Sequence, residues 1–195
     1  MKHLLVLLSL CLWTNSFLWA QEDSFSAKPA SEGFYNLTQL SFLIGENPVR
    51  EAELFPSIVN INGYRFNKHF SAGIGVGLTF LPDIIFPVFA DFRVALFDNN
   101  LSPILAIKGG YTFINKEKGV FGYYPTKGTR YAGGGMLNPE IGFSIPMTER
   151  ADFLLTLGYW YQHLKMENMD SNAPLSRYHT WDLNRVAFTI GFLFK

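Results

Sequence analysis

Histidines are the side chains best suited to acid–base chemistry near neutral pH, and the chain has four of them, His3, His69, His163 and His179. The last two flank a polar segment that holds Ser176 and the carboxylates of Glu167 and Asp170. A serine, a histidine and a carboxylate can perform acyl transfer or hydrolysis, but only within hydrogen-bond reach of one another. Polar loops contain such residues by default. The convergence of His163, His179 and Ser176 is therefore a hypothesis, and the sequence identifies no catalytic residue.

The sequence lacks the residue patterns that metal, cofactor and nucleic-acid sites need. Two histidines without a third placed ligand do not make a metal site, and Cys11 is the only cysteine. The glycines Gly73, Gly75 and Gly77 have the wrong spacing for a dinucleotide fingerprint. Basic and acidic residues are equal in number, 16 of each, so no polyanionic partner is indicated. We expect no metal, no cofactor and no nucleic-acid partner.

Long stretches of the chain alternate between apolar residues and small or polar ones, which is the period of a β-strand. In 69–80, one face carries Phe70, Ile74 and Phe80, and from residue 71 onward the other face carries only serine, glycine and threonine. Six segments of this kind are clear: 69–80, 88–97, 103–113, 136–145, 152–163 and 185–195. Two weaker segments, 33–45 and 57–66, switch parity, so their faces stay unassigned. The total of eight predicts an all-β, antiparallel, up-and-down barrel.

The barrel is expected to lie in a membrane. After residue 20 no apolar run is long enough for a transmembrane helix, so a chain that enters lipid must do so as a closed barrel. Each clear segment has about the length of a tilted membrane strand. An eight-stranded barrel has an interior that side chains just fill, and the small residues of 69–80 fit such a crowded space. We predict apolar residues toward lipid and no open pore.

Five charged residues lie on the predicted interior faces: Asp91, Arg93, Lys108, Glu140 and Arg185. Because an unpaired buried ion is strongly unfavourable, these charges must neutralise one another. We expect a network in which Asp91 and Glu140 bridge the three cations and fill the barrel. The alternative use of the same charges is an ion-conducting or proton-relay path. Pro139 has no amide hydrogen for the ladder, so we expect a bulge or the upper end of its strand to accommodate it.

The connections between the segments alternate in length. Short turns are predicted at 67–68, 98–100 and 146–150, and longer loops at 46–56, 114–135 and 165–180, with the short connection 82–85 as the exception. Transmembrane barrels show this asymmetry, with short periplasmic turns and longer outer loops. The long loops are therefore expected outside the cell.

Aromatic residues mark the expected outer boundary of the lipid. Four of them lie at the outer ends of two rising segments: Tyr111, Phe113, Tyr159 and Tyr161. Amphipathic rings prefer the water–lipid interface, so we predict an aromatic girdle at this height. The alternative is that they are ordinary strand aromatics.

Residues 1–20 have the pattern of a secretory signal peptide, with a basic start, a short apolar run and Ala20 at the expected cleavage site. The polar residues 21–32 predict a disordered leader before a barrel that spans 33–195. The alternatives are a retained N-terminal anchor and lipidation at Cys11.

Five stretches together resemble one known family: 61–77, 86–96, 102–113, 138–143 and 184–194. They are similar to the small outer-membrane β-barrel domain family, which is related in shape to OmpX- and OmpA-type eight-stranded barrels. The resemblance covers roughly 33–195. It implies a location in the outer membrane of a Gram-negative bacterium, contact with outer-membrane lipids and a monomeric state.

The last strand also looks like the signal that the barrel-assembly machinery reads, so this machinery is an expected partner during biogenesis. The residues that carry this likeness are Phe188, Ile190, Phe192 and Phe194. Lys195 departs from the pattern, because such barrels often end on the aromatic residue itself.

Three functions remain open at this point. The first is a structural or surface-interaction role carried by the outer loops, without a pore. The second is a lipid A-modifying outer-membrane enzyme, and the third is a soluble secreted barrel that binds an apolar ligand. We favour the first over an enzyme, because no motif in the chain specifies a reaction.

Overall fold

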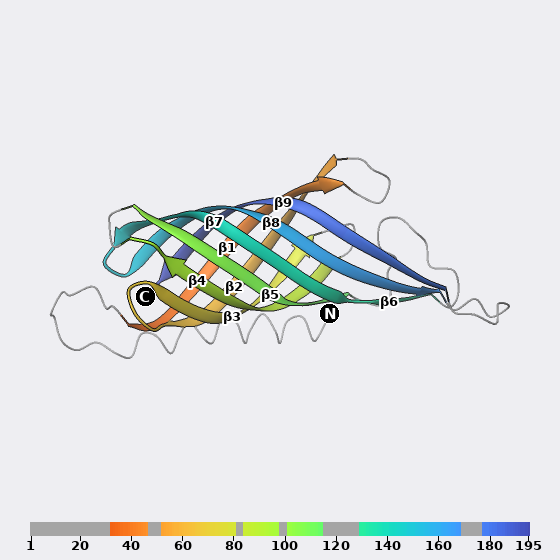
Figure 1. The fold of residues 1–195 in the computed structure, drawn as a ribbon, viewed down its shortest axis with the longest axis horizontal. Helices are drawn as coiled ribbons and strands as arrows, with labels where there is room; N and C mark the ends of the chain where they lie inside the picture. Colours follow the sequence, from red (N-terminus) through yellow and green to blue (C-terminus); the bar gives the residue numbers. More distant parts are fainter. Residues whose placement is uncertain (1–31, 47–51, 81–83, 98–100, 115–128, 169–176) are drawn as a thin grey trace.

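The computed structural model describes residues 32–46, 52–80, 84–97, 101–114, 129–168 and 177–195. In these residues the chain forms one antiparallel sheet that closes into an elongated barrel (Figure 1). Its strands are β1 (Gly33–Glu46), β2 (Ala52–Arg65), β3 (Phe70–Phe80), β4 (Ile84–Ala95), β5 (Ser102–Ile114), β6 (Thr129–Ala132), β7 (Gly134–Thr148), β8 (Ala151–Asn168) and β9 (Arg177–Phe194). The described residues contain no helix with the length and apolar character needed to cross a membrane. The predicted signal peptide, 1–20, and nearly all of the predicted leader, 21–32, lie outside them.

The sheet closes because its first strand pairs with its last. β1 to β5 pair in sequence, β5 pairs with β7, β7 with β8, β8 with β9, and β9 with β1. β6 and β7 are separated only by Gly133, and both pair with β8, so they occupy one position in the wall. The nine strands therefore make a barrel of eight. This confirms the predicted all-β, up-and-down, eight-stranded fold.

The two ends of the barrel differ. We call the end where β1 begins and β9 ends the base, on the left in Figure 1 where the C-terminus is marked, and the opposite end the top. Two short connections, 66–69 and 149–150, lie at the base. The predicted turn at 98–100 lies outside the described residues.

Strand ends near the top differ from the predicted ones. β2 begins at Ala52 and β4 at Ile84, so the connections before them are shorter than predicted. β8 and β9 continue as a paired ribbon to Asn168 and Arg177, well beyond the predicted boundaries. Backbone pairing holds this ribbon, with β6 alongside β8. Because these segments lack clear apolar alternation, periodicity did not mark them as strands.

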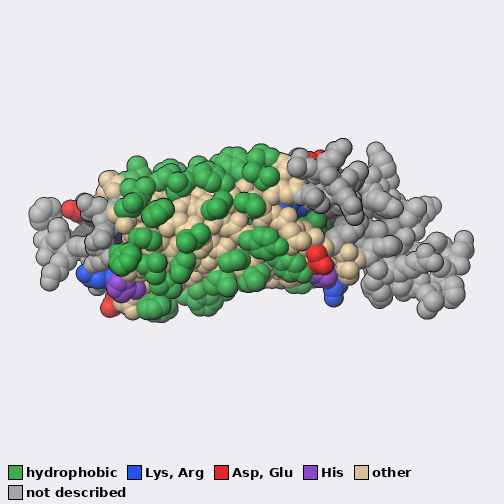
Figure 2. Space-filling view, turned by 45° about the horizontal axis from the view of Figure 1, so that its top comes forward, with side chains coloured by type: hydrophobic (Ala, Val, Ile, Leu, Met, Phe, Trp, Pro, Cys, Tyr) green, Lys and Arg blue, Asp and Glu red, His purple; other side chains and the backbone are tan. Residues whose placement is uncertain are grey.

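Alternation of side chains gives the barrel an apolar outside. On β3, Phe70, Ile74 and Val76 are exposed, as predicted. On the face drawn in Figure 2, hydrophobic side chains cover the middle of the wall, and charged side chains gather at its two ends. The interior is more apolar than predicted, because small and charged residues share it with a buried core. That core includes Leu37, Leu43, Val59, Ile61, Ile85, Phe89, Leu154 and Leu193.

Two aromatic rings fit inside the barrel because glycines face them. A Cβ on Gly75 would lie 2.4 Å from the Phe89 ring. A Cβ on Gly63 would lie 2.5 Å from the ring of Tyr35. Both rings are buried. The small interior residues therefore make room for large neighbours, which is how a narrow barrel reaches close packing.

β1 and β2 keep one parity throughout, although their sequences suggest a switch. The odd-numbered residues from Tyr35 to Leu43 and from Phe55 to Ile61 are buried, and the even-numbered ones face outward to varying degrees. The outward set includes Asn36, Asn60 and Asn62, whose amides bond to one another: Asn36 Nδ2 donates to Asn62 Oδ1 (2.8 Å) and Asn62 Nδ2 to Asn60 Oδ1 (3.0 Å). Polarity is locally inverted here, with amides outside and Leu37 and Ile61 inside. This inversion is why sequence alternation could not assign the faces.

Pro139 is accommodated without a bulge at its own position. It pairs with Ile107 of β5 in an unbroken register, and the β7–β8 register is the same on both sides of it. The side chain of Asn138 donates to the Tyr159 carbonyl (3.2 Å), which lies opposite the proline and receives no amide hydrogen from it. The β7–β8 irregularity lies instead between Pro146 and Thr148, next to the base.

Candidate functional site

All five charged residues predicted for the interior lie inside the barrel. They come from β4, β5, β7 and β9, and none is more than 5% exposed. Asp91 of β4 and Lys108 of β5 stand opposite each other in the sheet. Four of the charges therefore meet at one stretch of wall that the neighbouring strands β4, β5 and β7 share, and the fifth, Arg185, lies on β9.

The first ion pair joins two residues of one strand. Asp91 and Arg93 are two positions apart on β4, so both side chains point into the barrel. Arg93 Nε donates to Asp91 Oδ2 (2.7 Å) and Nη2 donates to Oδ1 (2.9 Å), a two-pronged contact. Arg93 Nη2 also reaches Gln39 Oε1 of β1 (3.3 Å), across the interior.

The second ion pair joins two neighbouring strands. Lys108 Nζ of β5 donates to Glu140 Oε1 of β7. Thr156 of β8 donates its hydroxyl to the other carboxylate oxygen, Glu140 Oε2 (3.3 Å). Gly158 of β8 leaves the space that this carboxylate occupies, since a Cβ there would lie 2.8 Å from Glu140 Cγ. Around the wall, Arg93, Asp91, Lys108 and Glu140 alternate in sign.

Arg185 stays outside this arrangement. Its guanidinium lies 5.0 Å from the centre of the Phe55 ring, and none of its three nitrogens has a hydrogen-bond partner. Glu53 acts on it as a nearby charge. The five residues therefore form two ion pairs and a separate cation, rather than the single network that we predicted.

The four residues of the predicted aromatic girdle lie toward the top. Tyr111, Phe113 and Tyr159 are exposed, and the rings of Tyr111 and Phe113 are 5.1 Å apart. Two hydroxyls bond to β9: Tyr159 donates to Asn184 Oδ1 (2.6 Å), and Tyr161 donates to Asp182 Oδ1 (2.7 Å).

A second aromatic group lies near the base. The ring of Tyr64 is 5.1 Å from Phe34 and 5.5 Å from Phe66. The sequence did not predict this group, because it lies in the two segments whose faces could not be assigned.

His163 is the one histidine of the catalytic hypothesis that has a described side-chain contact. Its Nδ1 lies 2.7 Å from Asp182 Oδ1 on the outside of the barrel near the top, beside Tyr161. His179 lies on β9 opposite Met166, and Ser176 lies outside the described residues. Among the described residues, no three histidine, cysteine or acidic side chains are grouped as metal ligands would be.

Residues of the predicted assembly signal point outward on β9. Phe188, Phe192 and Phe194 are exposed, and Ile190 is half-buried. Phe192 packs edge-to-face on Phe153 of β8 (5.4 Å between ring centres). This strand closes the barrel against β1.

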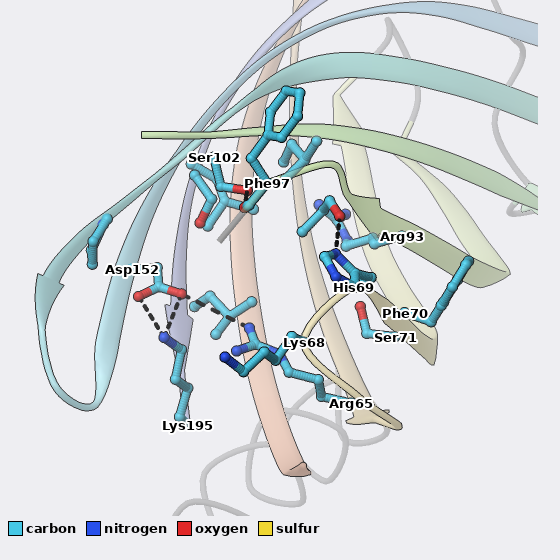
Figure 3. A pocket seen from close by; sticks show the side chains of 16 residues that line it. Arg65, Lys68, His69, Phe70, Ser71, Arg93, Phe97, Ser102, Asp152 and Lys195 are labelled. Atoms are coloured by element: carbon cyan, nitrogen blue, oxygen red, sulfur yellow. Dashed lines mark hydrogen bonds and ion pairs between the residues drawn. The ribbon is translucent and has the colours of Figure 1, made fainter. Parts of the chain in front are cut away.

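A cavity of about 300 Å³ lies at the base, and Figure 3 shows the side chains around it. Its charged lining consists of Arg65, Lys68, Arg93, Asp152 and Lys195, with His69 beside them. Sequence reasoning missed this site, because its residues come singly from several strands and from the 66–69 turn. Only Arg93 carried a signal, as a charge within an apolar strand.

Comparison with solved structures places this architecture among small outer-membrane barrels. Neisserial surface protein A (NspA) aligns with a TM-score of 0.60 and 11% identity over 84% of this chain and 98% of that one. OprG from Pseudomonas aeruginosa aligns at 0.56 and 12% over 85% and 95%, and AlkL, studied in DMPC lipid bilayers, aligns at 0.56 and 8% over 89% and 96%. No protein-family model and no curated protein sequence matches the chain. At these identities the likeness concerns the fold: the chain is folded as a small, eight-stranded barrel of the outer-membrane type.

Proposed function

We propose that this chain is an integral outer-membrane protein of a Gram-negative bacterium, whose filled barrel displays its top-end loops for interactions at the cell surface. The observation that carries the proposal is the contrast between an exposed apolar wall and an interior packed with buried side chains. An apolar surface of this extent is unfavourable in water and favourable in lipid. The same contrast argues against a soluble carrier of an apolar ligand, which would direct its apolar residues inward.

A closed interior supports a role other than conduction. The two ion pairs and the apolar core fill the barrel's cross-section, and Trp160 and Leu37 are among its fully buried side chains. An eight-stranded barrel has no spare width for a water channel beside such residues. Purified protein in planar bilayers should therefore give no stable conductance steps. Reproducible steps that Glu140→Gln alters would contradict the filled barrel and favour an ion path.

The proposed orientation puts the base in the periplasm and the top outside. The short turns lie at the base, and the longest connections, 115–128 and 169–176, leave from the top. The only cysteine, Cys11, falls in the predicted signal peptide, so the mature chain suits labelling at single introduced cysteines. Lys127→Cys should react with an impermeant thiol reagent on intact cells, and Glu149→Cys should react only after the outer membrane is opened. The reverse pattern would overturn this orientation.

Membrane insertion itself has a direct test. The protein should fractionate with outer membranes, resist carbonate extraction and show heat-dependent mobility in detergent gels. Complete release by carbonate would contradict an integral barrel. The outward aromatic residues of β9 support recognition by the barrel-assembly machinery, and Phe194→Ser should lower the amount of assembled protein. The same gels, run after mild crosslinking, test the proposed monomer.

A lipid-modifying enzyme is the second candidate, and one observation favours it. Asp182 holds His163 Nδ1 on the outer surface near the top, an arrangement that orients the other ring nitrogen as a base. In the described residues no serine contacts this histidine. Lipid A mass spectra from a deletion strain, complemented with the wild type or with His163→Gln, test this role. An unchanged lipid profile would exclude it.

A further inference from the structure

A polar patch interrupts the apolar outer wall near the base. We call it the asparagine patch, and it consists of four outward side chains of β1 and β2: Asn36, Thr38, Asn60 and Asn62. Asn62 is exposed, and the other three are half-buried. The patch begins one outward position further into the wall than the paired rings of Phe34 and Tyr64. It therefore lies on the membrane side of the aromatic group at the base, where the apolar lipid chains begin.

The asparagine patch shortens the apolar wall at these two strands. On β3 every outward residue from Phe70 to Phe80 is apolar, which gives about 25 Å of wall for a strand tilted by about 40°. Beyond the patch, the outward apolar run covers Leu40 to Ile44 on β1 and Leu54 to Ile58 on β2, about 10 Å each. Lipid beside β1 and β2 thus meets a wall less than half as tall as on β3. Such a mismatch favours a locally thinner bilayer.

The amides of the patch bond to one another without using all of their donors. Asn36 Nδ2 donates to Asn60 Oδ1 (3.1 Å) and to Asn62 Oδ1 (2.8 Å). Asn60 Nδ2 donates to Asn36 Oδ1 (3.1 Å) and to Thr38 Oγ1 (2.9 Å). Asn62 Nδ2 donates to Asn60 Oδ1 (3.0 Å), although a side-chain amide carries two hydrogens. Within the described residues the network therefore leaves one N–H of Asn62 for an outside acceptor, because an unpartnered polar group is strongly unfavourable in lipid.

Exposed apolar side chains flank the patch on both sides. On β3, Ile74 stands opposite Asn62 and is 68% exposed. On β9, Phe194 stands opposite Asn36 and is 51% exposed. A molecule that covers this region must offer hydrogen-bond acceptors in the middle and apolar groups beside them. A phospholipid has both, in its ester and phosphate oxygens and its acyl chains, whereas a stable protein interface needs roughly 20–30 residues from each partner.

We propose that the asparagine patch binds the ester and phosphate oxygens of a phospholipid in the leaflet at the base, and that it thins this leaflet beside β1 and β2. The lipid oxygens accept the remaining hydrogen of Asn62, and the acyl chains cover Ile74 and Phe194. Because β1 also pairs with β9, the thinned leaflet lies at the seam where the barrel closes. The proposal rests on the membrane-embedded barrel and not on the role of the top-end loops.

The first test measures lipid contacts of the wild-type protein in phosphatidylcholine nanodiscs by nuclear Overhauser effects. The side-chain amide of Asn62 should give cross-peaks to glycerol and headgroup protons. Leu105 is the internal control, because it is exposed and lies three residues from the base end of β5, as Asn62 does on β2. Its methyl groups should give cross-peaks to acyl methylene protons.

Three results of this test would overturn the proposal. They are amide cross-peaks to acyl methylenes, amide cross-peaks to water alone, and, in a mixed-label sample, cross-peaks between two copies of the chain. The last result would assign the patch to a second copy. Missing acyl contacts at Leu105 would instead contradict the embedded barrel itself, so the two failures are distinguishable.

The second test measures the effect of the patch on the preferred bilayer thickness. Folding yield is compared in dilauroyl- and dioleoylphosphatidylcholine vesicles by heat-dependent gel mobility. The triple variant Asn36→Leu/Asn60→Leu/Asn62→Leu extends the apolar wall, so its yield in the thicker dioleoyl bilayer, relative to the dilauroyl one, should rise by about twofold or more. Ile141→Leu, at an exposed apolar position of β7, is the matched control and should keep the wild-type ratio. A triple variant that shifts the ratio no more than Ile141→Leu does would overturn the proposed thinning.

Discussion

The middle and the top of the barrel interior hold buried charges in different ways. In the middle, Asp91 binds Arg93 and Glu140 binds Lys108, so each carboxylate has a cation. Near the top, Arg185 is 1% exposed and makes no hydrogen bond; the Phe55 ring lies beside its guanidinium, and the charge of Glu53 acts on it from nearby. The same narrow barrel thus contains charges neutralised by partners and a charge that rests on an aromatic face.

Polar atoms near Arg185 are also left without partners. Trp160, its partner across β8 and β9, has an unpaired indole nitrogen, and both amide atoms of Gln162 are unpaired. In the middle, Glu140 has a donor on each carboxylate oxygen, and the unpaired atoms there belong to the neighbouring Arg93 Nη1, Gln39 Nε2 and Asn138 Oδ1. Removing a partner is costly only where a buried charge would be left alone. Variants in the two regions should therefore differ more than the similar burial of these residues suggests.

Lys108→Met should have the largest effect, because it leaves Glu140 charged, buried and without its cation. The free energy of unfolding should fall by about 3–5 kcal/mol. Urea unfolding of protein refolded into lipid vesicles, followed by tryptophan fluorescence, measures this loss.

The double variant Lys108→Met/Glu140→Leu is the control for this prediction. Removing both charges leaves no unpaired ion, so most of the lost stability should return. If the double variant is as unstable as the sum of the two single variants, the pair does not act as a unit.

Asp91→Asn should have the next largest effect. It keeps the shape of the side chain but replaces a charged acceptor of Arg93 with a neutral one. A loss of about 1.5–3 kcal/mol follows from weakening hydrogen bonds to a charged group. The same urea titration measures it, and Asn184→Ala on the outer surface serves as a comparison. An unchanged midpoint would mean that Gln39 and water can replace Asp91.

Gly158→Ala tests the packing that positions the second ion pair. The added Cβ would lie 2.8 Å from both Glu140 Cγ and the Pro139 carbonyl, so backbone must move. We expect a loss of about 1–3 kcal/mol, as is typical of overpacking. Gly135→Ala is the matched control, because nothing lies within 4 Å of a Cβ there. Equal stability of the two variants in urea would show that Glu140 has room to spare.

The lipid-facing and interior faces of most strands were predictable, because apolar residues alternate with small or polar ones along them. β3, and β9 from Val186 onward, carry apolar residues at every outward position, so lipid and interior sides were separable from the sequence. β1 and β2 were not, because Asn36 and Asn62 satisfy each other outside while Leu37 and Ile61 are buried inside. Apolar alternation cannot detect two outward polar side chains that form hydrogen bonds with each other.

The position of each interior charge was predictable, but its partner was not. A charge within an apolar strand is expected on the interior side, and the structure buries Lys108 and Arg185 there. Pairing depends on register between strands, and the contact of Lys108 with Glu140 joins residues 32 positions apart. No local pattern places Phe55 beneath Arg185. The cavity at the base was invisible for the same reason, since closure of the barrel is what gathers its lining.

Arg185→Met gives the smallest expected effect and tests the comparison most directly. The substitution breaks no hydrogen bond among the described residues, and methionine can keep a favourable contact with the Phe55 ring. Replacing a buried, unbonded cation with an apolar side chain removes an unfavourable burial, so the stability should change by less than about 1 kcal/mol or rise slightly. Lys108→Met is the paired measurement, since it removes an equally buried cation from the middle of the same interior. A loss at Arg185 as large as the loss at Lys108 would mean that the top of the barrel holds its cation by an anion or ordered water, and the distinction between the two regions would then fail.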